Sequence, residues 1–175
     1  AGRVGYYAIQ WAKLTGAIVI ATASSANSIA QCEKAGADLV VGHPNDASNK
    51  KIMEFTKGRK IDRVVEGDFG ANLLPILDIL KTSGVIASYS SMTDMNPSIP
   101  FVRMMFMDIT IRLVLVYAMP DSAKKAAIRD ITTFLSDNKL DNRIAATYPL
   151  DEIAQAHQTI ESRNVYGSCL LYQSD

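Results

Sequence analysis

The chain of 175 residues is poor in the residues that mark metal-binding, disulfide-linked and nucleic-acid-binding proteins. It has two histidines and two isolated cysteines, Cys32 and Cys169, so neither a zinc centre nor a disulfide framework is indicated. Its 18 basic residues balance its 18 acidic ones, which argues against a face for nucleic acid or an anionic membrane. No apolar run reaches the roughly 18 residues of a membrane-spanning helix. We therefore expect a cytoplasmic protein without a bound metal, a membrane contact or a nucleic-acid partner.

The chain also lacks an initiating methionine and begins inside a glycine pattern, AGRVG. Gly2 and Gly5 take the second and third positions of G-x-G-x-x-G, the turn at which a backbone approaches the pyrophosphate of a dinucleotide. The first glycine and the strand that leads into it would precede Ala1. We expect a fragment of a longer enzyme, although the same letters also fit an ordinary glycine-containing loop before a helix.

The rest of the chain alternates between helical and strand patterns. Apolar spacing predicts helices over residues 4–14, 25–35, 47–57, 72–80, 120–137 and 150–162, and strands over 17–23, 39–41, 61–66, 84–89, 109–117, 143–148 and 166–172. This alternation predicts parallel βαβ units, and hence a Rossmann-type α/β fold with a doubly wound, mostly parallel sheet over residues 1–175. The missing first strand would be central, so its two neighbours would each have an unpaired edge.

No carboxylate follows the predicted strand of residues 17–23, which is the second strand when the missing first one is counted. At this place NAD-preferring sites usually hold the ribose hydroxyls with Asp or Glu. The stretch instead offers the hydroxyls of Ser24, Ser25 and Ser28. These could accommodate a 2′-phosphate, which favours NADP(H) over NAD(H), although no Arg or Lys lies among them. Ser25 or Asn27 could equally cap the following helix.

Other signatures of catalysis are missing. There is no G-x-S-x-G motif and no Cys–His arrangement, and His157 falls on an amphipathic helix as a surface or packing residue. We therefore nominate no catalytic residue.

Five segments together resemble the medium-chain dehydrogenase/reductase superfamily, most of all its zinc-independent, zeta-crystallin-like quinone oxidoreductases. They are AGRVGYYAIQWAK, EKAGADLVV, VVEGDFGANL, GVIASYSS and RIAATYPLDEIAQAHQTIESRNVYGSCLL. The resemblance runs nearly from end to end of the chain. It implies a cofactor-binding domain whose GroES-like catalytic domain, where zinc ligands of the superfamily mostly lie, is largely absent.

The resemblance implies a parent enzyme that transfers hydride from NADPH to a quinone, while the fragment alone should be inactive. An enoyl reductase acting on the double bond of an enone is the nearest alternative. A non-catalytic, crystallin-like or binding protein is the alternative of another class.

The resemblance also implies which residues contact NADP(H). They are Gly2, Arg3, Val4 and Gly5 at the pyrophosphate turn, Ser24, Ser25, Ser28 and His43 around the adenosine, Asp68, Phe69, Gly70, Ser88, Tyr89 and Ser90 after the fourth and fifth strands, and Leu115, Val116 and Tyr117 near the nicotinamide. Two positions depart from the family. Ser28 stands where a phosphate-binding Lys is common, and His43-Pro44 where Tyr-Arg is common.

Finally, the resemblance implies a homodimer in which strands around residues 109–117 pair between two copies. Light scattering at micromolar concentration should therefore give the mass of two chains. The mass of a single chain at that concentration would contradict this expectation.

Overall fold

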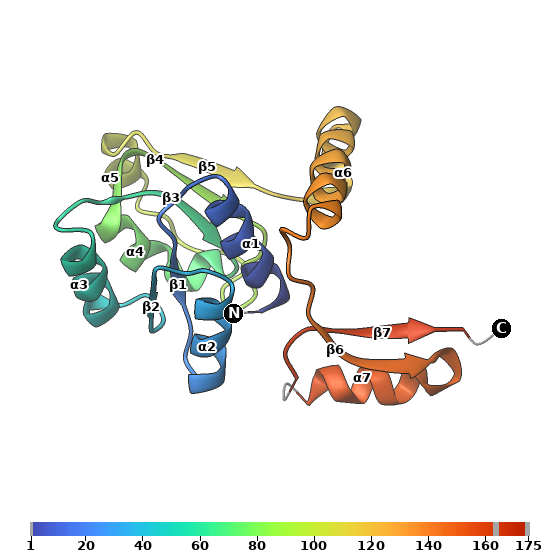
Figure 1. The fold of residues 1–175 in the computed structure, drawn as a ribbon. Coiled ribbons are helices and arrows are strands. Elements are labelled where there is room, and N and C mark those ends of the chain that lie inside the picture. The colour runs from blue at the N-terminus through green and yellow to red at the C-terminus, as the bar shows by residue number, and fades with distance from the viewer. Residues whose placement is uncertain (1, 163–164, 174–175) are drawn as a thin grey trace.

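The computed structural model describes residues 2–162 and 165–173, so Ala1 of the glycine pattern lies outside it. It shows an α/β fold in which every strand pairing of the described residues is parallel (Figure 1). The strands are β1 (Ile20–Thr22), β2 (Leu39–Val41), β3 (Ile61–Glu66), β4 (Leu80–Ser88), β5 (Thr110–Leu113), β6 (Ile144–Pro149) and β7 (Ser168–Tyr172). The helices are α1 (Arg3–Leu14), α2 (Ala26–Lys34), α3 (Asp46–Phe55), α4 (Phe69–Ile79), α5 (Phe101–Phe106), α6 (Asp121–Ser136) and α7 (Ile153–Glu161), with short 3₁₀ turns η1 (Val116–Ala118) and η2 (Leu150–Glu152).

The strands form three separate sheets. Strand β1 pairs with β2, the next sheet has the order β3-β4-β5, and β6 pairs with β7. In a Rossmann sheet the first strand lies between those that correspond here to β1 and β3. The separation of β1 from β3 therefore agrees with the prediction of two strands left unpaired on one edge.

Two strands are shorter than their apolar runs predict. Strand β1 begins at Ile20 because the backbone N–H of Val19 donates to the Asp38 carboxylate at 2.7 Å, while Val19 accepts from the N–H of Asp38 at 2.8 Å. These bonds replace the regular ladder at the start of the predicted strand. Strand β5 ends at Leu113, and the 3₁₀ turn η1 replaces the rest of the strand predicted up to residue 117.

Three helices also differ from the prediction. Helix α7 begins at Ile153 rather than at residue 150, because the 3₁₀ turn η2 takes its first residues. Helix α4 begins at Phe69 rather than near residue 72, and the carbonyl of Asp68 accepts its first helical hydrogen bond from the N–H of Asn72 at 3.2 Å. Helix α5 was not predicted at all. It follows the loop of residues 91–100 and buries Met104 against α4 and β4.

The described core has three clusters, one of which joins β2 and α3 to α4 and so bridges the sheets of β1 and of β3. One cluster lies between α1, α2 and β1 and contains Tyr6, Ile9 and Cys32. A second surrounds α4 and β4, where Leu77 and Ile86 are fully buried. Each such side chain contributes about 1.5–3 kcal/mol of burial free energy, so these clusters hold the helices that surround the site.

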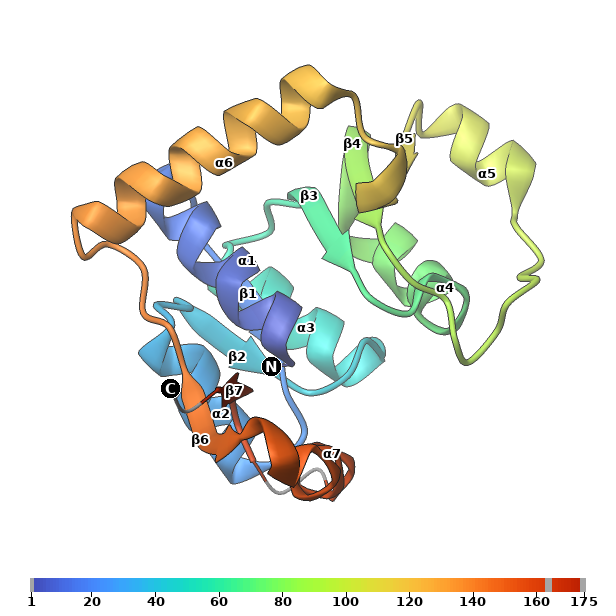
Figure 2. The same ribbon diagram turned by 90° about the vertical axis from the view of Figure 1, so that its right-hand side faces the viewer.

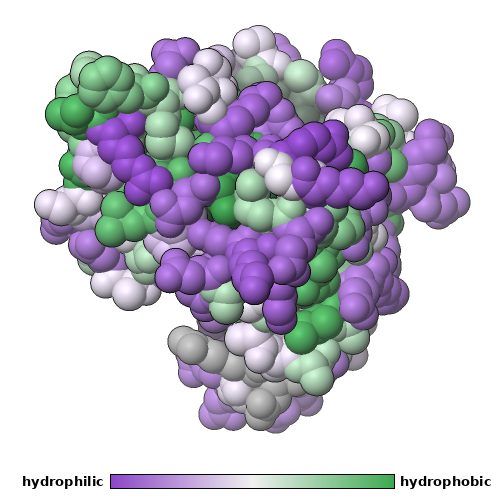
Figure 3. All heavy atoms as spheres, turned by 90° about the vertical axis from the view of Figure 1, so that its left-hand side faces the viewer, coloured by the Kyte–Doolittle hydropathy of each residue, from purple (hydrophilic) through white to green (hydrophobic). Residues whose placement is uncertain are grey.

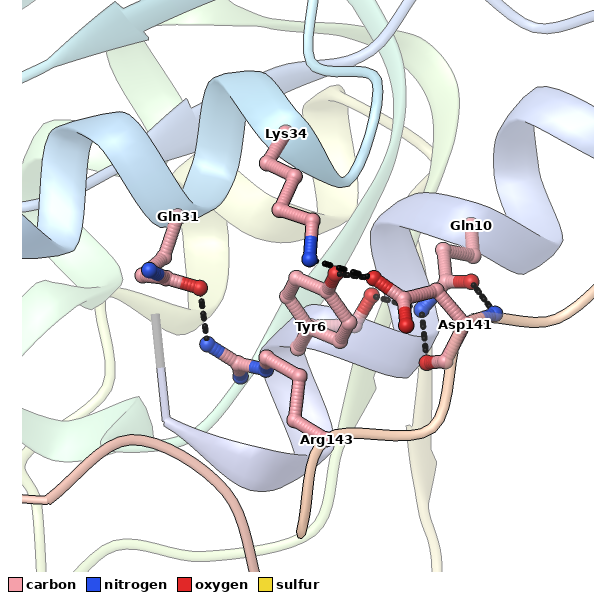
Figure 4. Close-up of polar contacts among 6 residues, drawn as sticks. All are labelled: Tyr6, Gln10, Gln31, Lys34, Asp141 and Arg143. Atoms are coloured by element: carbon pink, nitrogen blue, oxygen red, sulfur yellow. Dashed lines mark hydrogen bonds and ion pairs between the residues drawn. The ribbon is translucent and has the colours of Figure 1, made fainter. Parts of the chain in front are cut away.

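Strands β6 and β7, with α7 between them, form a lobe that shares no sheet with the rest of the described chain (Figure 1). We call residues 141–173 the C-terminal lobe. Its start is fastened to α1 and α2 by side chains (Figure 4). The Tyr6 hydroxyl donates to Asp141 at 2.6 Å, and Lys34 pairs with the same carboxylate at 3.0 Å. Gln10 bonds both the N–H and the C=O of Asp141, at 2.7 and 3.2 Å.

These contacts shift the pKa values of both Tyr6 and Asp141. Burial, followed by the hydrogen bond to Asp141, raises the pKa of Tyr6 to about 12. The hydrogen bond from Tyr6, followed by that from Lys34, lowers the pKa of Asp141 below its ordinary value of 3.8. At neutral pH the pair is therefore a neutral phenol that donates to a carboxylate, which is a charge-assisted hydrogen bond.

Replacing Tyr6 by Phe should lower the free energy of unfolding by about 1–3 kcal/mol, because it removes this bond and leaves the ring in place. Because the folded-state pKa of Asp141 is depressed, the difference from the wild type should be present above about pH 4 and shrink as the carboxyl is protonated below it. Urea unfolding between pH 3 and pH 7 measures both effects.

Tyr7→Phe is the matched control, because the exposed hydroxyl of Tyr7 donates to neighbouring Asn142 at 2.9 Å. It should cost less than about 0.5 kcal/mol. Equal losses for the two variants would show that the Tyr6–Asp141 bond has no special role.

Candidate functional site

A cleft of about 410 Å³ lies where α1 begins and where β1 and β2 end. In open parallel sheets ligands bind beyond the carboxyl ends of the strands, and this cleft has that position. The C-terminal lobe forms its opposite wall through residues such as Tyr166 and Gly167, just before β7, and Figure 2 shows this lobe below the N-terminal end of α1. The described residues that line the cleft are Gly2, Arg3, Thr22, Ala23, Ser24, Ser28, His43, Arg143, Ile160, Val165, Tyr166 and Gly167.

Five of the residues predicted to bind the cofactor meet in this cleft. They are Gly2, Arg3, Ser24, Ser28 and His43, which come from the start of α1, the segment between β1 and the first turn of α2, and the loop after β2. Val4 and Gly5 follow directly in the first turn of α1. The structure therefore brings together the two segments that were predicted separately for the pyrophosphate and the adenosine.

The beginning of α1 is open to the cleft. A Cβ atom on Gly2 would meet no atom within 4 Å, and no side chain caps the helix. The N–H groups of a first helical turn have no partner within the helix and attract anions. This open end fits the pyrophosphate of a dinucleotide.

The serines after β1 have a structural role as well. Ser25 is the N-cap of α2, since its hydroxyl accepts from the N–H of Ser28 at 3.2 Å. The same hydroxyl lies 2.9 Å from that of Ser28 and 3.5 Å from that of Tyr166. Hydrogen bonds from Ser25 and then Ser28 lower the pKa of Tyr166. Of the two candidates for the cap of this helix, Ser25 and Asn27, it is therefore Ser25 that caps α2. Its hydroxyl also faces the C-terminal lobe.

Sequence reasoning missed the wall that the C-terminal lobe contributes. Arg143 and Tyr166 line the cleft with polar atoms, although they are more than a hundred residues away from Ser28. No local pattern marks such a contact. The only available signal was their place in the segment that resembles the family most specifically.

A second group of predicted residues lies at the carboxyl ends of β3 and β4, where their polar groups bind within the group or to the loop that follows β4. Asp68 accepts from the N–H and hydroxyl of Thr93, and these bonds lower the pKa of its carboxyl. The N–H of Phe69 donates to Ser90 at 3.0 Å, while the Phe69 ring is buried in the core. Gly70 is needed for packing, since its Cβ would lie 2.5 Å from the carbonyl oxygen of Asp94.

Ser88 and Tyr89 complete this second group. Ser88 is buried, and its hydroxyl donates to the carbonyl of Ser90 at 3.1 Å. Tyr89 is partly exposed, and burial followed by the charge of Glu66 raises the pKa of its phenol. The residues of this group do not line the cleft at α1, so their contact with a cofactor stays a prediction.

The third predicted group, Leu115, Val116 and Tyr117, follows β5. All three side chains are exposed, that of Tyr117 by 88%. Leu115 lines a shallow hollow of about 270 Å³ next to Arg112 and Met119. Their predicted approach to the nicotinamide is not tested by these contacts.

Two further properties bear on the kind of site. In residues 2–162 and 165–173, no three His, Cys, Asp or Glu side chains are grouped so that they could hold a metal ion. Across the same residues, no helix is both long and apolar enough to span a membrane.

Known proteins resemble the chain in sequence and in fold. The chain is 30% identical over 183 residues to a quinone oxidoreductase of Salmonella typhimurium, and 26% identical over 179 residues to a 2-haloacrylate reductase of a Burkholderia species. These alignments cover 98% of this chain but 54% and 53% of the two relatives, so the chain spans about half of their length.

A solved structure, Escherichia coli quinone oxidoreductase complexed with NADPH, superimposes with a TM-score of 0.81 at 25% identity. The match covers 98% of this chain and 54% of that one, and it confirms the Rossmann-type α/β fold. A sequence profile of the zinc-binding dehydrogenases matches residues 4–133. The chain therefore belongs to the zinc-binding dehydrogenase family, within the medium-chain dehydrogenase/reductase superfamily that its motifs resemble.

Proposed function

We propose that the protein carrying this chain is an NADPH-dependent reductase that transfers hydride to a quinone. The observation that carries the proposal is the cleft at the start of α1, whose described lining holds two arginines and a histidine but no carboxylate. Such a lining suits a ligand with several phosphate groups. The names of the relatives support the oxidoreductase class, and quinone is the substrate in the name of the Salmonella protein.

The chain's own residues bind and orient in this proposal. The open first turn of α1 and Arg3 hold the pyrophosphate, while Ser24, Ser28 and His43 surround the adenosine. When bound, the reduced nicotinamide supplies the hydride.

We also propose a homodimer that uses the edge next to β5. Strand β5 is the last of its sheet and has a free edge among the described strands. Leu113 and Tyr117 beside it are exposed, and so are Phe101 and Phe106 on α5. Figure 3 shows hydrophobic side chains gathered at its upper left, over α5. Large apolar patches of this kind mark protein–protein contacts.

The second candidate is a reductase of activated double bonds. It is favoured by the Burkholderia relative, whose name gives 2-haloacrylate, an unsaturated acid, as the compound reduced. The fold and cofactor would be the same, and only the acceptor would differ.

The test is oxidation of NADPH by the full-length protein, followed at 340 nm with 1,4-benzoquinone or with an α,β-unsaturated ketone. Quinone-dependent oxidation is the expected result. Activity with the ketone alone would replace the first candidate by the second, and activity with neither would support a non-catalytic binding protein.

Gly2→Val tests the role of the cleft in the same protein. A Cβ at this position meets no protein atom within 4 Å, so the fold should persist, while the valine side chain fills the space needed by the pyrophosphate. The Kd for NADPH should rise at least about tenfold in a calorimetric titration. Gly42→Val is the control, since its Cβ is equally free of contacts and Gly42 does not line the cleft. An unchanged Kd in Gly2→Val would place the cofactor elsewhere.

A further inference from the structure

Arg143 stands out in the cleft because its charge has no acidic partner at contact distance in the described part of the chain. No ion pair is found for it among the described residues. Its neighbour Asp141 is already bound by Tyr6 and Lys34. Buried or half-buried arginines are usually paired, so a cation left open beside a cleft favours an anionic ligand.

The guanidinium group is held in place from two sides (Figure 4). Its central carbon lies 3.4 Å from the centroid of the Tyr6 ring, and its Nη1 donates to Gln31 at 2.8 Å. Its Nε is shut off from solvent and has no hydrogen-bond partner among residues 2–162 and 165–173. Stacking and one neutral hydrogen bond fix the plane of the group but leave most of its donors unused.

This position lies next to the serines predicted to hold a 2′-phosphate. Gln31 is three residues after Ser28 on α2, so the two side chains are neighbours on the helix surface. Both Arg143 and Ser28 line the cleft. The guanidinium, which is bound to Gln31, is therefore within one helical turn of the hydroxyls at the start of α2.

We infer that Arg143 is the residue that selects NADPH over NADH, by pairing with the 2′-phosphate beside Ser28. It supplies from the C-terminal lobe the cation that the segment after β1 lacks. A planar guanidinium with free donors suits a phosphate dianion, which can accept two parallel hydrogen bonds. The inference rests on the cofactor part of the proposed function and is independent of the acceptor.

Arg3 lines the same cleft but has a different expected role. As the first residue of α1, it stands at the end that fits the pyrophosphate. A pyrophosphate is common to both dinucleotides, so Arg3 should strengthen binding of either one. The two arginines can therefore be separated by ligands that differ in the 2′-phosphate alone.

The experiment titrates the full-length protein with adenosine 2′,5′-bisphosphate and with 5′-AMP in a calorimeter. Arg143→Gln should weaken binding of the bisphosphate by about 10- to 100-fold, the usual effect of losing hydrogen bonds to a charged group. Its affinity for 5′-AMP should change by less than about twofold. Arg3→Gln should weaken both ligands by similar factors. Arg129→Gln removes an equal charge, together with an exposed ion pair to Asp130 on α6 away from the cleft, and should affect neither.

Equal losses for the two ligands in Arg143→Gln would overturn the inference and leave Arg143 a structural role. Unchanged binding of the bisphosphate would overturn it as well. Should Arg143→Gln fail to fold, judged by its circular dichroism, Arg143→Lys decides. Lys keeps the charge without the planar fork, so only the bisphosphate should bind more weakly, by at least about threefold.

The readout does not depend on turnover. Loss of bisphosphate binding in the variant, together with a wild-type protein that oxidises no NADPH, would leave Arg143 as the selecting residue and contradict the proposed reductase. An active quinone reductase that prefers NADH would support the proposed reaction and contradict the selecting role of Arg143.

Discussion

The hydrogen bond from Tyr6 to Asp141 is the contact on which the cleft depends. Strands β6 and β7 pair only with each other among the described strands, so no backbone ladder joins the C-terminal lobe to the other sheets. Side chains make that connection instead: Tyr6, Gln10 and Lys34 all bind Asp141, and the residues beside it add single contacts to α1 and α2. Because Arg143 is two residues beyond Asp141, the same contacts decide where its guanidinium lies.

Most of the fold could be predicted from the sequence, because it depends on local patterns. Strand β3 has the predicted bounds, and β2 matches as well, since their apolar residues are flanked by polar turns. The length of β1 could not be predicted from its apolar residues, because it depends on pairing with β2. Next to β2 the side chain of Asp38, rather than a strand backbone, accepts from the N–H of Val19. Helix α5 is six residues long and has no side-chain cap, so it gave little signal.

Part of the candidate site could also be predicted, because some of its residues belong to local sequence patterns. Glycines before a helix and serines after a buried strand are local signals, and both segments do meet in the cleft. Arg143 carries no such signal. It is 112 residues away from Gln31 and reaches the cleft only through the packing of a lobe on a helix. A search for basic residues near the serines in the sequence could therefore not find it.

The cleft is bounded by the start of α1, the loops after β1 and β2, and the C-terminal lobe, which do not share one sheet. A ligand that touches all three must restrict their relative motion, and the entropy lost in doing so reduces its affinity. How rigidly the lobe is already held thus matters as much as the contacts the ligand makes. Tyr6 and Gln10 do not line the cleft. By holding the C-terminal lobe in place before a ligand arrives, they reduce the entropy that is lost on binding.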